Sequence, residues 1–173
     1  MKRSQIHPMP EYFDRYINLC DDVELLAAIQ ISIQELKDLP MEKLIALEDK
    51  VYAPGKWRVK DIFQHMIDTE RIFTFRALSF AREEKKPLPS YDENEYATAA
   101  NANHLSIERL VFELQLVHQS FLTMYENFSP EMLNGKGQGF KGEYSVASIG
   151  FIMPGHQRWH LNVIQERYLP LIG

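Results

Sequence analysis

Two histidines, His156 and His160, stand four residues apart near the end of the 173-residue chain. Residues with this spacing lie one above the other on a helix, so two imidazoles can present nitrogen atoms to one ion. Apolar neighbours such as Ile149, Ile152 and Val163 recur at spacings of three and four, which places both histidines on the face that points to the core. The pair predicts two metal ligands on one helix, although a core also accepts such a pair by chance.

A third histidine, His65, is expected to point toward the same interior, because it follows Ile62 by three residues and adjoins Met66. Burial of an unpaired imidazole costs about 1 to 3 kcal/mol, and a shared cation removes that penalty. Three protein ligands leave positions for water or substrate, as in catalytic metal sites. Two interpretations stay open from the residues alone: one three-histidine metal centre, or three core histidines that are hydrogen-bonded separately.

The remaining histidines and the single cysteine carry weaker signals. His7 precedes a proline near the N-terminus, His104 comes before a predicted helix, and His118 follows a valine within one. We expect all three to be solvated or boundary residues. Cys20 has no second cysteine to pair with and no histidine beside it, so we expect a buried small apolar residue and not a nucleophile.

A metal site of this kind also needs an acid or a base. Asp68 lies one turn from His65 and is the preferred candidate for this catalytic role. The alternative is an exposed carboxylate paired with Arg71 or Arg76. Asp92 and Glu93, farther along the chain, could instead fold over the pocket or remain solvated in a loop.

Four segments have the apolar spacing of helices, and stretches with Pro, Gly or Asn separate them, which predicts an all-α four-helix bundle. Asp21 or Asp22 could cap the first helix and Ser106 the third. Pro154 and Gly155 should kink the fourth, because proline removes one backbone hydrogen bond and crowds the preceding turn. The predicted helices cover residues 22–38, 56–84, 106–128 and 145–169.

Two connections between these helices are long. The segment 90–103 between the second and third helices is expected to be a crossover with a short helical turn, long enough to span the bundle. The glycine-rich segment 135–142 has no strand before it and no Lys-Ser or Lys-Thr after it, so it does not predict a phosphate-binding loop. We expect a flexible connection there.

Length, charge and hydropathy narrow the classes of protein. A chain of 173 residues with 45% apolar content predicts one domain over residues 1–173. The net charge of −5, with both signs interspersed, argues against a nucleic-acid partner, which needs clustered Lys and Arg, and against an anionic membrane surface. No apolar run is long enough to span a membrane and no signal peptide is visible, so we expect a cytoplasmic protein.

Three separate blocks of the sequence match one known group in order and spacing. They are APGKWRVKDIFQHMIDTERIFTFRA at 53–77, PLPSYDENEY at 87–96 and GHQRWHLNVIQERYL at 155–169. Through these blocks the chain resembles the DinB-like superfamily over nearly its whole length. The resemblance implies a four-helix bundle, often dimeric, with a divalent metal held by one histidine of the second helix and a His-x-x-x-His pair of the last. Those positions are His65, His156 and His160 here.

One residue departs from the family pattern. Trp159 stands where relatives of this branch often have a middle histidine. Because position 159 is not one of the expected ligands, the three-histidine set is kept, and the tryptophan is expected to alter the pocket wall.

The resemblance implies several activities, among them transfer of small thiols to electrophiles and isomerisation or hydrolysis of small molecules. The first hypothesis is a metal-dependent thiol transferase or hydrolase with Zn, Ni or another first-row ion and a small-molecule substrate or thiol. The second is a non-catalytic homodimeric module that binds a small ligand or a partner. An aromatic excess is expected to form the core and the dimer interface, and not a cofactor cage; it includes Phe73, Phe75, Phe80, Trp57 and Trp159.

Overall fold

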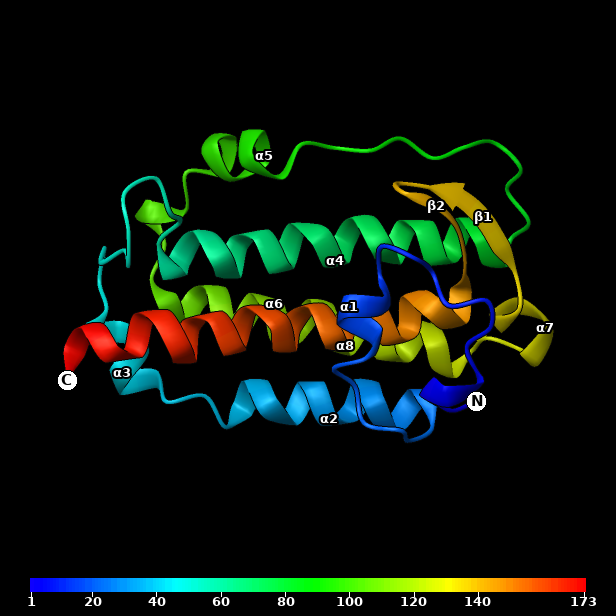
Figure 1. Cartoon of the computed structure of the whole chain (residues 1–173), viewed down its shortest axis with the longest axis horizontal. Coiled ribbons are helices and arrows are strands. Elements are labelled where there is room, and N and C mark those ends of the chain that lie inside the picture. Colours follow the sequence, from blue (N-terminus) through cyan, green and yellow to red (C-terminus); the bar gives the residue numbers. More distant parts are fainter.

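The computed structural model describes residues 1–173 and places four long helices side by side, as Figure 1 shows. The all-α four-helix bundle expected from the apolar spacing is therefore confirmed. Each long helix has one buried face, and the four buried faces meet along the axis of the bundle. The long helices are α2 (Leu25–Lys37), α4 (Val59–Ala81), α6 (Ile107–Glu126) and α8 (Val146–Val163).

The directions in which the four long helices run depend on one long connection, between α4 and α6. In Figure 1, α4 and α6 run in the same direction, whereas α2 and α8 run in the opposite one. The chain between α4 and α6 therefore returns along the whole bundle, and it carries the short helix α5 (Glu93–Ala100), which contacts α4. This is the predicted crossover. Its first part is held by a backbone hydrogen bond of 2.9 Å from Leu88 N to Gln138 O.

Helix ends agree with the predicted ranges to within about three residues, except at the C-terminal end of the last helix, and one predicted cap is wrong. Ser106 caps α6, with its hydroxyl accepting from Arg109 N at 3.2 Å. Asp22 caps nothing: its carboxylate accepts from Ser4 N at 2.8 Å, and Glu24 occupies the cap position of α2. The N-terminal segment folds back on this end of α2, and Ser4 of this segment donates to the Asp22 carboxylate that was predicted to cap the helix.

The last helix passes through Pro154 without a break in its helical assignment. At its C-terminal end α8 passes into one π-helical turn, Ile164–Tyr168, so the α-helix ends earlier than the predicted residue 169. The continuous helix keeps His156 and His160 in fixed register.

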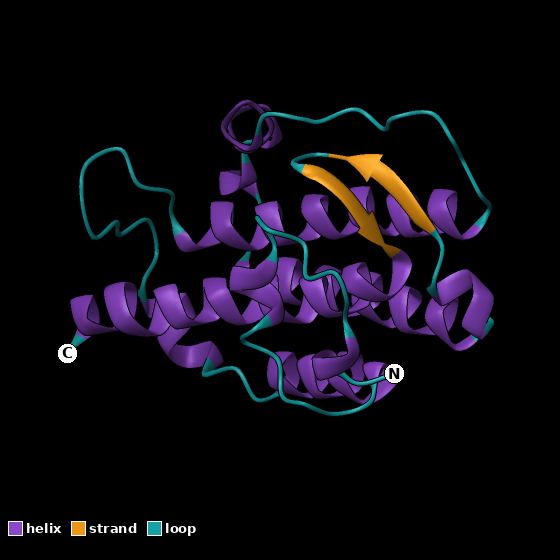
Figure 2. Cartoon of the chain, turned by 45° about the vertical axis from the view of Figure 1, so that its right-hand side comes forward, coloured by secondary structure: helices purple, strands orange, loops and turns teal.

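The glycine-rich connection is a β-hairpin and not the flexible segment expected from its composition. Strands β1 (Lys136–Gly139) and β2 (Gly142–Ser145) pair antiparallel over the upper bundle face (Figure 2). A Cβ on Gly137 would lie 2.1 Å from the Phe80 ring, so glycine is required for the strand to rest on that ring. Lys141, at φ 64°, and Gly142, at φ 125°, make the tight connection.

Two apolar clusters fill the two ends of the bundle, and a polar layer separates them. One cluster lies under the hairpin and includes Phe73 and Phe80; the other lies near the C-terminus and includes Phe63. Between them are the buried polar side chains of Ser32, Thr69, Glu70, His118, His156 and Gln157. The buried polar residues, among them the candidate metal ligand His156, therefore lie at the middle of the bundle.

Short elements complete the chain. None of its helices combines the length and hydropathy required to cross a bilayer. The short α-helices are α1 (Asp14–Ile17), α3 (Met41–Ala46) and α7 (Pro130–Leu133), and the 3₁₀ segments are Arg3–Gln5, Ala102–His104 and Leu169–Ile172.

Candidate metal centre

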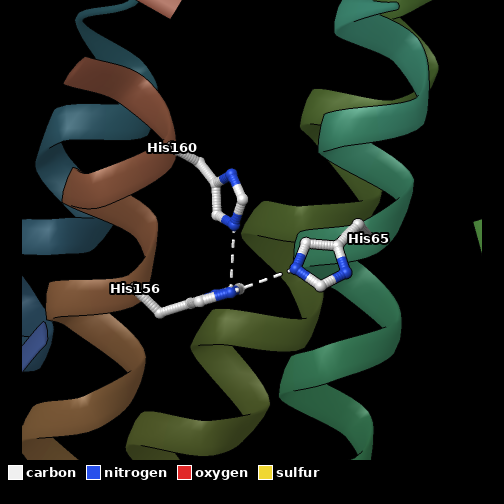
Figure 3. Close-up of side chains that lie close together, drawn as sticks. All are labelled: His65, His156 and His160. Atoms are coloured by element: carbon white, nitrogen blue, oxygen red, sulfur yellow. Dashed lines mark hydrogen bonds between the residues drawn. The ribbon is translucent and has the colours of Figure 1, made fainter. Parts of the chain in front are cut away.

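Two helices bring three histidines to one point. His65 projects from α4, and His156 and His160 project from consecutive turns of α8, with the rings directed toward one another (Figure 3). The Nε2 atom of His156 lies 3.1 Å from Nε2 of His65 and 3.1 Å from Nε2 of His160. One ligand atom from each residue lies within 4.8 Å of the others. The rings thus converge as the i, i+4 spacing predicts.

Burial keeps these imidazoles neutral at physiological pH. It lowers the pKa of His65 to about 4 and that of His160, with a further contribution from His65, to about 3. The pKa of His156 is lowered well below its usual range by burial and by the two neighbouring histidines. A neutral imidazole keeps a nitrogen lone pair that can bind a metal.

The residues present fit a divalent ion. A neutral imidazole nitrogen carries either one hydrogen or one lone pair, so His156 Nε2 cannot make good hydrogen bonds to both neighbours at once. A cation that accepts all three lone pairs removes this conflict. Tetrahedral coordination with metal–nitrogen distances of 2.0–2.1 Å sets neighbouring nitrogens about 3.3 Å apart, close to the observed 3.1 Å.

Other side chains fix the orientation of the rings. Thr69 Oγ1 lies 3.4 Å from His65 Nδ1 and 2.7 Å from the Tyr91 hydroxyl. The Tyr16 ring packs edge-on against His156 with centroids 5.1 Å apart, and the Trp57 ring lies 4.9 Å from His65. The contact to the outer nitrogen of His65 sets which of its nitrogens is free to bind a metal, and the aromatic contacts hold the planes of the rings.

A cavity with aromatic walls begins at this cluster. His65 and His156 line it together with Thr69, Tyr91 and Glu93. Because Glu93 is exposed on α5, the cavity opens to solvent beneath the crossover. Glu93, which the sequence offered as an alternative to Asp68, is the carboxylate among its lining residues. A separate surface groove reaches His160 and is lined there by Trp57 and Trp159.

The structure does not bring Asp68 into this cavity. Its carboxylate accepts from Gln64 Nε2 at 2.9 Å and faces a groove between α4 and α5. Burial raises the pKa of Asp68, and the hydrogen bond from Gln64 opposes this shift. The alternative partner is not used either, since Arg71 pairs with Glu113 at 2.7 Å. The sequence alone did not determine where the Asp68 side chain points, because a residue three positions after His65 need not face the same cavity.

His118 is not the solvated or boundary residue that the sequence suggested. It is 1% exposed, with Nδ1 2.8 Å from Glu70 Oε2 and Nε2 in contact with Ser32 Oγ. The order of groups resembles a hydrolytic Ser-His-acid set, but all three side chains are buried, so no substrate reaches them. The burial of His118 could have been predicted from the sequence, because His118 continues the apolar spacing of Leu114 and Phe121.

The other candidates have simple environments. Cys20 is buried, with Sγ 3.2 Å from the carbonyl oxygen of Phe151, as expected of a small apolar residue. His104 is exposed on the crossover. Trp159 is 41% exposed and packs edge-on against Tyr16 at 5.7 Å, so it forms the rim of the groove beside His160.

Comparison with solved structures supports the architecture. YfiT from Bacillus subtilis, described as "a probable metal-dependent hydrolase with an unusual four-helix bundle topology", superposes with a TM-score of 0.67. The match covers 93% of this chain and 88% of that one at 16% sequence identity. At this identity the likeness concerns the fold.

Sequence comparison gives relatives and a family. Two proteins of Oceanobacillus iheyensis and one of Geobacillus thermodenitrificans, each named "Putative metal-dependent hydrolase", are 25%, 26% and 26% identical over 117, 137 and 102 residues. These matches span 65%, 75% and 57% of this chain and 65%, 79% and 57% of the relatives. The family model of the DinB superfamily matches residues 13–164. The chain therefore belongs to the DinB superfamily.

Proposed function

We propose that the protein is a hydrolase of small molecules that depends on a divalent metal ion held by His65, His156 and His160. The observation that carries the proposal is the convergence of three neutral Nε2 atoms, two pairs of them 3.1 Å apart, next to a solvent-connected cavity that His65 and His156 line. The names of the sequence relatives support the reaction class. A bound ion of this kind supplies Lewis acidity and makes water a nucleophile at neutral pH.

The residues of the chain have separate roles in this proposal. The aromatic walls exclude bulk water and hold an apolar substrate. Glu93 accepts the proton released when water attacks, because it is the carboxylate that lines the cavity. Thr69 keeps the proton of His65 on Nδ1 and leaves Nε2 free. The hydroxyl of Tyr91, bonded to Thr69, orients the substrate at the same wall.

Hydrolysis by metal-stripped and reconstituted protein tests this proposal. Tag-free protein would be treated with a chelator, reloaded with Zn, Ni, Co or Mn, and assayed on p-nitrophenyl esters and anilides. We expect turnover only with metal, loss in His156→Ala, and a fall of about 100-fold or more in Glu93→Gln. Asp68→Asn is the matched carboxylate control and should retain activity.

Two outcomes would contradict the proposal. Hydrolysis rates that do not depend on metal or on the three histidines would favour the second hypothesis, a non-catalytic binding module. Faster consumption of an electrophile such as 1-chloro-2,4-dinitrobenzene when a small thiol is added, without hydrolysis of any ester or anilide, would indicate thiol transfer instead.

A further inference from the structure

A buried arginine lines the same cavity as the histidines. Arg76 lies on α4, three turns beyond His65, and only 1% of its surface is exposed. Side chains on a helix lean toward its N-terminus, so the guanidinium is directed back toward the histidine end of the cavity. Its positive charge lowers the pKa of Tyr91, against the larger opposite effect of burial, which places it near that hydroxyl.

This buried guanidinium has no counter-ion in the protein, whereas three less buried arginines have one. Arg158 pairs with Glu35 at 2.7 Å, Arg58 with Asp61 at 3.2 Å and Arg71 with Glu113 at 2.7 Å. Burying an unpaired charge is costly, and buried charges in proteins are normally paired. The most buried of these arginines is thus the one without a carboxylate.

Part of the guanidinium is already bound and part is free. Nη2 of Arg76 donates to Pro89 O at 2.9 Å, and Cζ lies 4.6 Å from the centroid of the Phe73 ring. These contacts fix the orientation of the group. Nη1 is buried and has no hydrogen-bond acceptor in the protein. A planar donor held in this way is suited to a carboxylate.

A second unpaired donor lies beside it. The hydroxyl of Tyr144, which lies beside Arg76 and not among the residues that line the cavity, is also buried and makes no hydrogen bond of ordinary geometry; its ring stacks on Phe73 with centroids 6.2 Å apart. Burial raises the pKa of this hydroxyl, and Arg76 lowers it both by its positive charge and as a hydrogen-bond donor, so the guanidinium lies within reach of the Tyr144 oxygen. Even with the guanidinium donating to the Tyr144 oxygen, the Tyr144 O–H still lacks an acceptor. Buried polar groups without a partner are rare, and this one beside a buried cation indicates a missing acceptor.

We propose that Arg76 and Tyr144 bind the carboxylate of a small molecule whose apolar body lies between the aromatic walls and whose reactive group reaches the three histidines. The inference rests on the proposed function, since it names the charge of its substrate. The walls are formed by the rings of Tyr12, Phe13, Tyr16, Phe73, Tyr91 and Phe140. Glu93 at the mouth makes a second negative charge unfavourable, so a monoanion fits better than a phosphate dianion.

Binding of a matched acid and amide tests the inference. Calorimetry would compare 3-phenylpropionate with 3-phenylpropionamide, which has the same shape without the charge. Wild-type protein should bind the acid on the order of 10- to 100-fold more tightly than the amide. Arg76→Gln should abolish this preference, whereas Arg71→Gln, which removes an arginine of the same helix paired outside the cavity, should keep it.

Two further variants distinguish a loss of carboxylate binding from a loss of folding. Arg76→Lys keeps the charge and should retain part of the preference. Tyr144→Phe keeps the ring packing, removes a hydroxyl that has no partner, and should reduce the preference without loss of thermal stability. A purely structural role of either residue would alter binding of the acid and the amide equally, which would overturn the inference.

The metal state separates this inference from the proposed function, because a carboxylate could also bind an ion directly. Each titration would be run on metal-loaded and metal-stripped full-length protein, with metal content measured on the same samples. A preference that survives stripping and depends on Arg76 supports the inference, even if the wild-type protein proves to bind no metal and the proposed function fails. A preference lost on stripping and unchanged in Arg76→Gln would overturn it.

Discussion

Each imidazole of the cluster acts through one nitrogen, and the state of the other nitrogen decides which one is free. For His65 the outer nitrogen faces the Thr69 hydroxyl at 3.4 Å, and that hydroxyl is held in turn by Tyr91 at 2.7 Å. Groups of this kind influence metal affinity without touching the metal.

We therefore expect Thr69→Val, which keeps the shape and removes the hydroxyl, to weaken metal binding by about tenfold. Competition with a chromophoric chelator would measure the change. Thr74→Val is the matched control, because its hydroxyl lies on the same helix but bonds only the carbonyl of Glu70, at 2.7 Å. Equal affinities for the wild type and Thr69→Val would show that this hydroxyl does not orient His65.

The candidate site could be predicted from the sequence in part. His65, His156 and His160 follow from apolar spacing, because the direction of a core-facing residue is fixed by the helix that carries it. Glu93 appeared only as an alternative to Asp68, and Tyr91 and Arg76 could not be selected, since their place in the cavity depends on how the crossover lies on α4. No local pattern encodes that docking.

At the scale of elements, α1 crosses α8 directly at the metal centre. A Cβ on Gly155 would lie 2.0 Å from the carbonyl oxygen of Tyr16, so the two backbones touch next to His156. The ring of Tyr16 then covers His156. This contact fixes the N-terminal segment over the cavity that it helps to line.

Gly155→Ala should therefore destabilise the protein by about 1 to 3 kcal/mol, because overpacking against the backbone outweighs the gain of about 1 kcal/mol in helix propensity. Urea denaturation would measure the change in the free energy of unfolding. Gly150→Ala is the control on the same helix, where the added methyl group meets side-chain atoms of Leu25 and Tyr125 at 2.9 Å and these can move. A larger loss in Gly150→Ala would refute the proposed backbone contact.

The elements themselves show where sequence patterns suffice. The four long helices follow from apolar spacing, and the Ser106 cap from its residue type and place. The hairpin was missed because its glycines serve to seat the Phe80 and Tyr144 side chains, a tertiary requirement that composition does not show. The cap at Asp22 failed for a similar reason, since Ser4 reaches its carboxylate from a distant part of the chain.

At the scale of the molecule, a polar layer holds the four long helices together between two apolar clusters. Glu70 of α4 pairs with His118 of α6 at 2.8 Å, His118 contacts Ser32 of α2, and Gln157 of α8 donates to the carbonyl of Ser32 at 2.9 Å. A buried pair of this kind fixes how the helices align.

Breaking the pair should cost far more than breaking one at the surface. Glu70→Ala is expected to lower the free energy of unfolding by about 3 to 5 kcal/mol, because it leaves His118 buried without its partner. Glu113→Ala, which removes the more exposed pair with Arg71, should cost about 1 kcal/mol or less. Chemical denaturation of both variants would test this, and similar losses would contradict the buried pairing.

Stability of the metal-free protein should fall as the pH is lowered. The pKa of His65 is about 4 in the folded protein against an ordinary value of 6.5, so between these limits the unfolded chain binds protons that the folded chain excludes. For this residue alone the loss is roughly 3 kcal/mol. His65→Asn should flatten the dependence between pH 6.5 and 4, whereas His104→Ala should not; equal slopes in all three proteins would contradict the neutral buried cluster.

The oligomeric state stays a prediction. Phe75 and Trp159, expected in a core or a dimer interface, are 57% and 41% exposed, while Phe73 and Phe80 are buried. The two exposed rings are available to a partner, and sedimentation at several protein concentrations would show whether a dimer forms.

The most direct test of the metal centre is the metal content of tag-free protein. Wild-type protein reloaded with Zn and desalted should retain one ion per chain, as measured by inductively coupled plasma mass spectrometry. His65→Ala, His156→Ala and His160→Ala should each lose it while His104→Ala keeps it. Absence of metal from the wild type, or full retention in His160→Ala, would contradict the three-histidine centre.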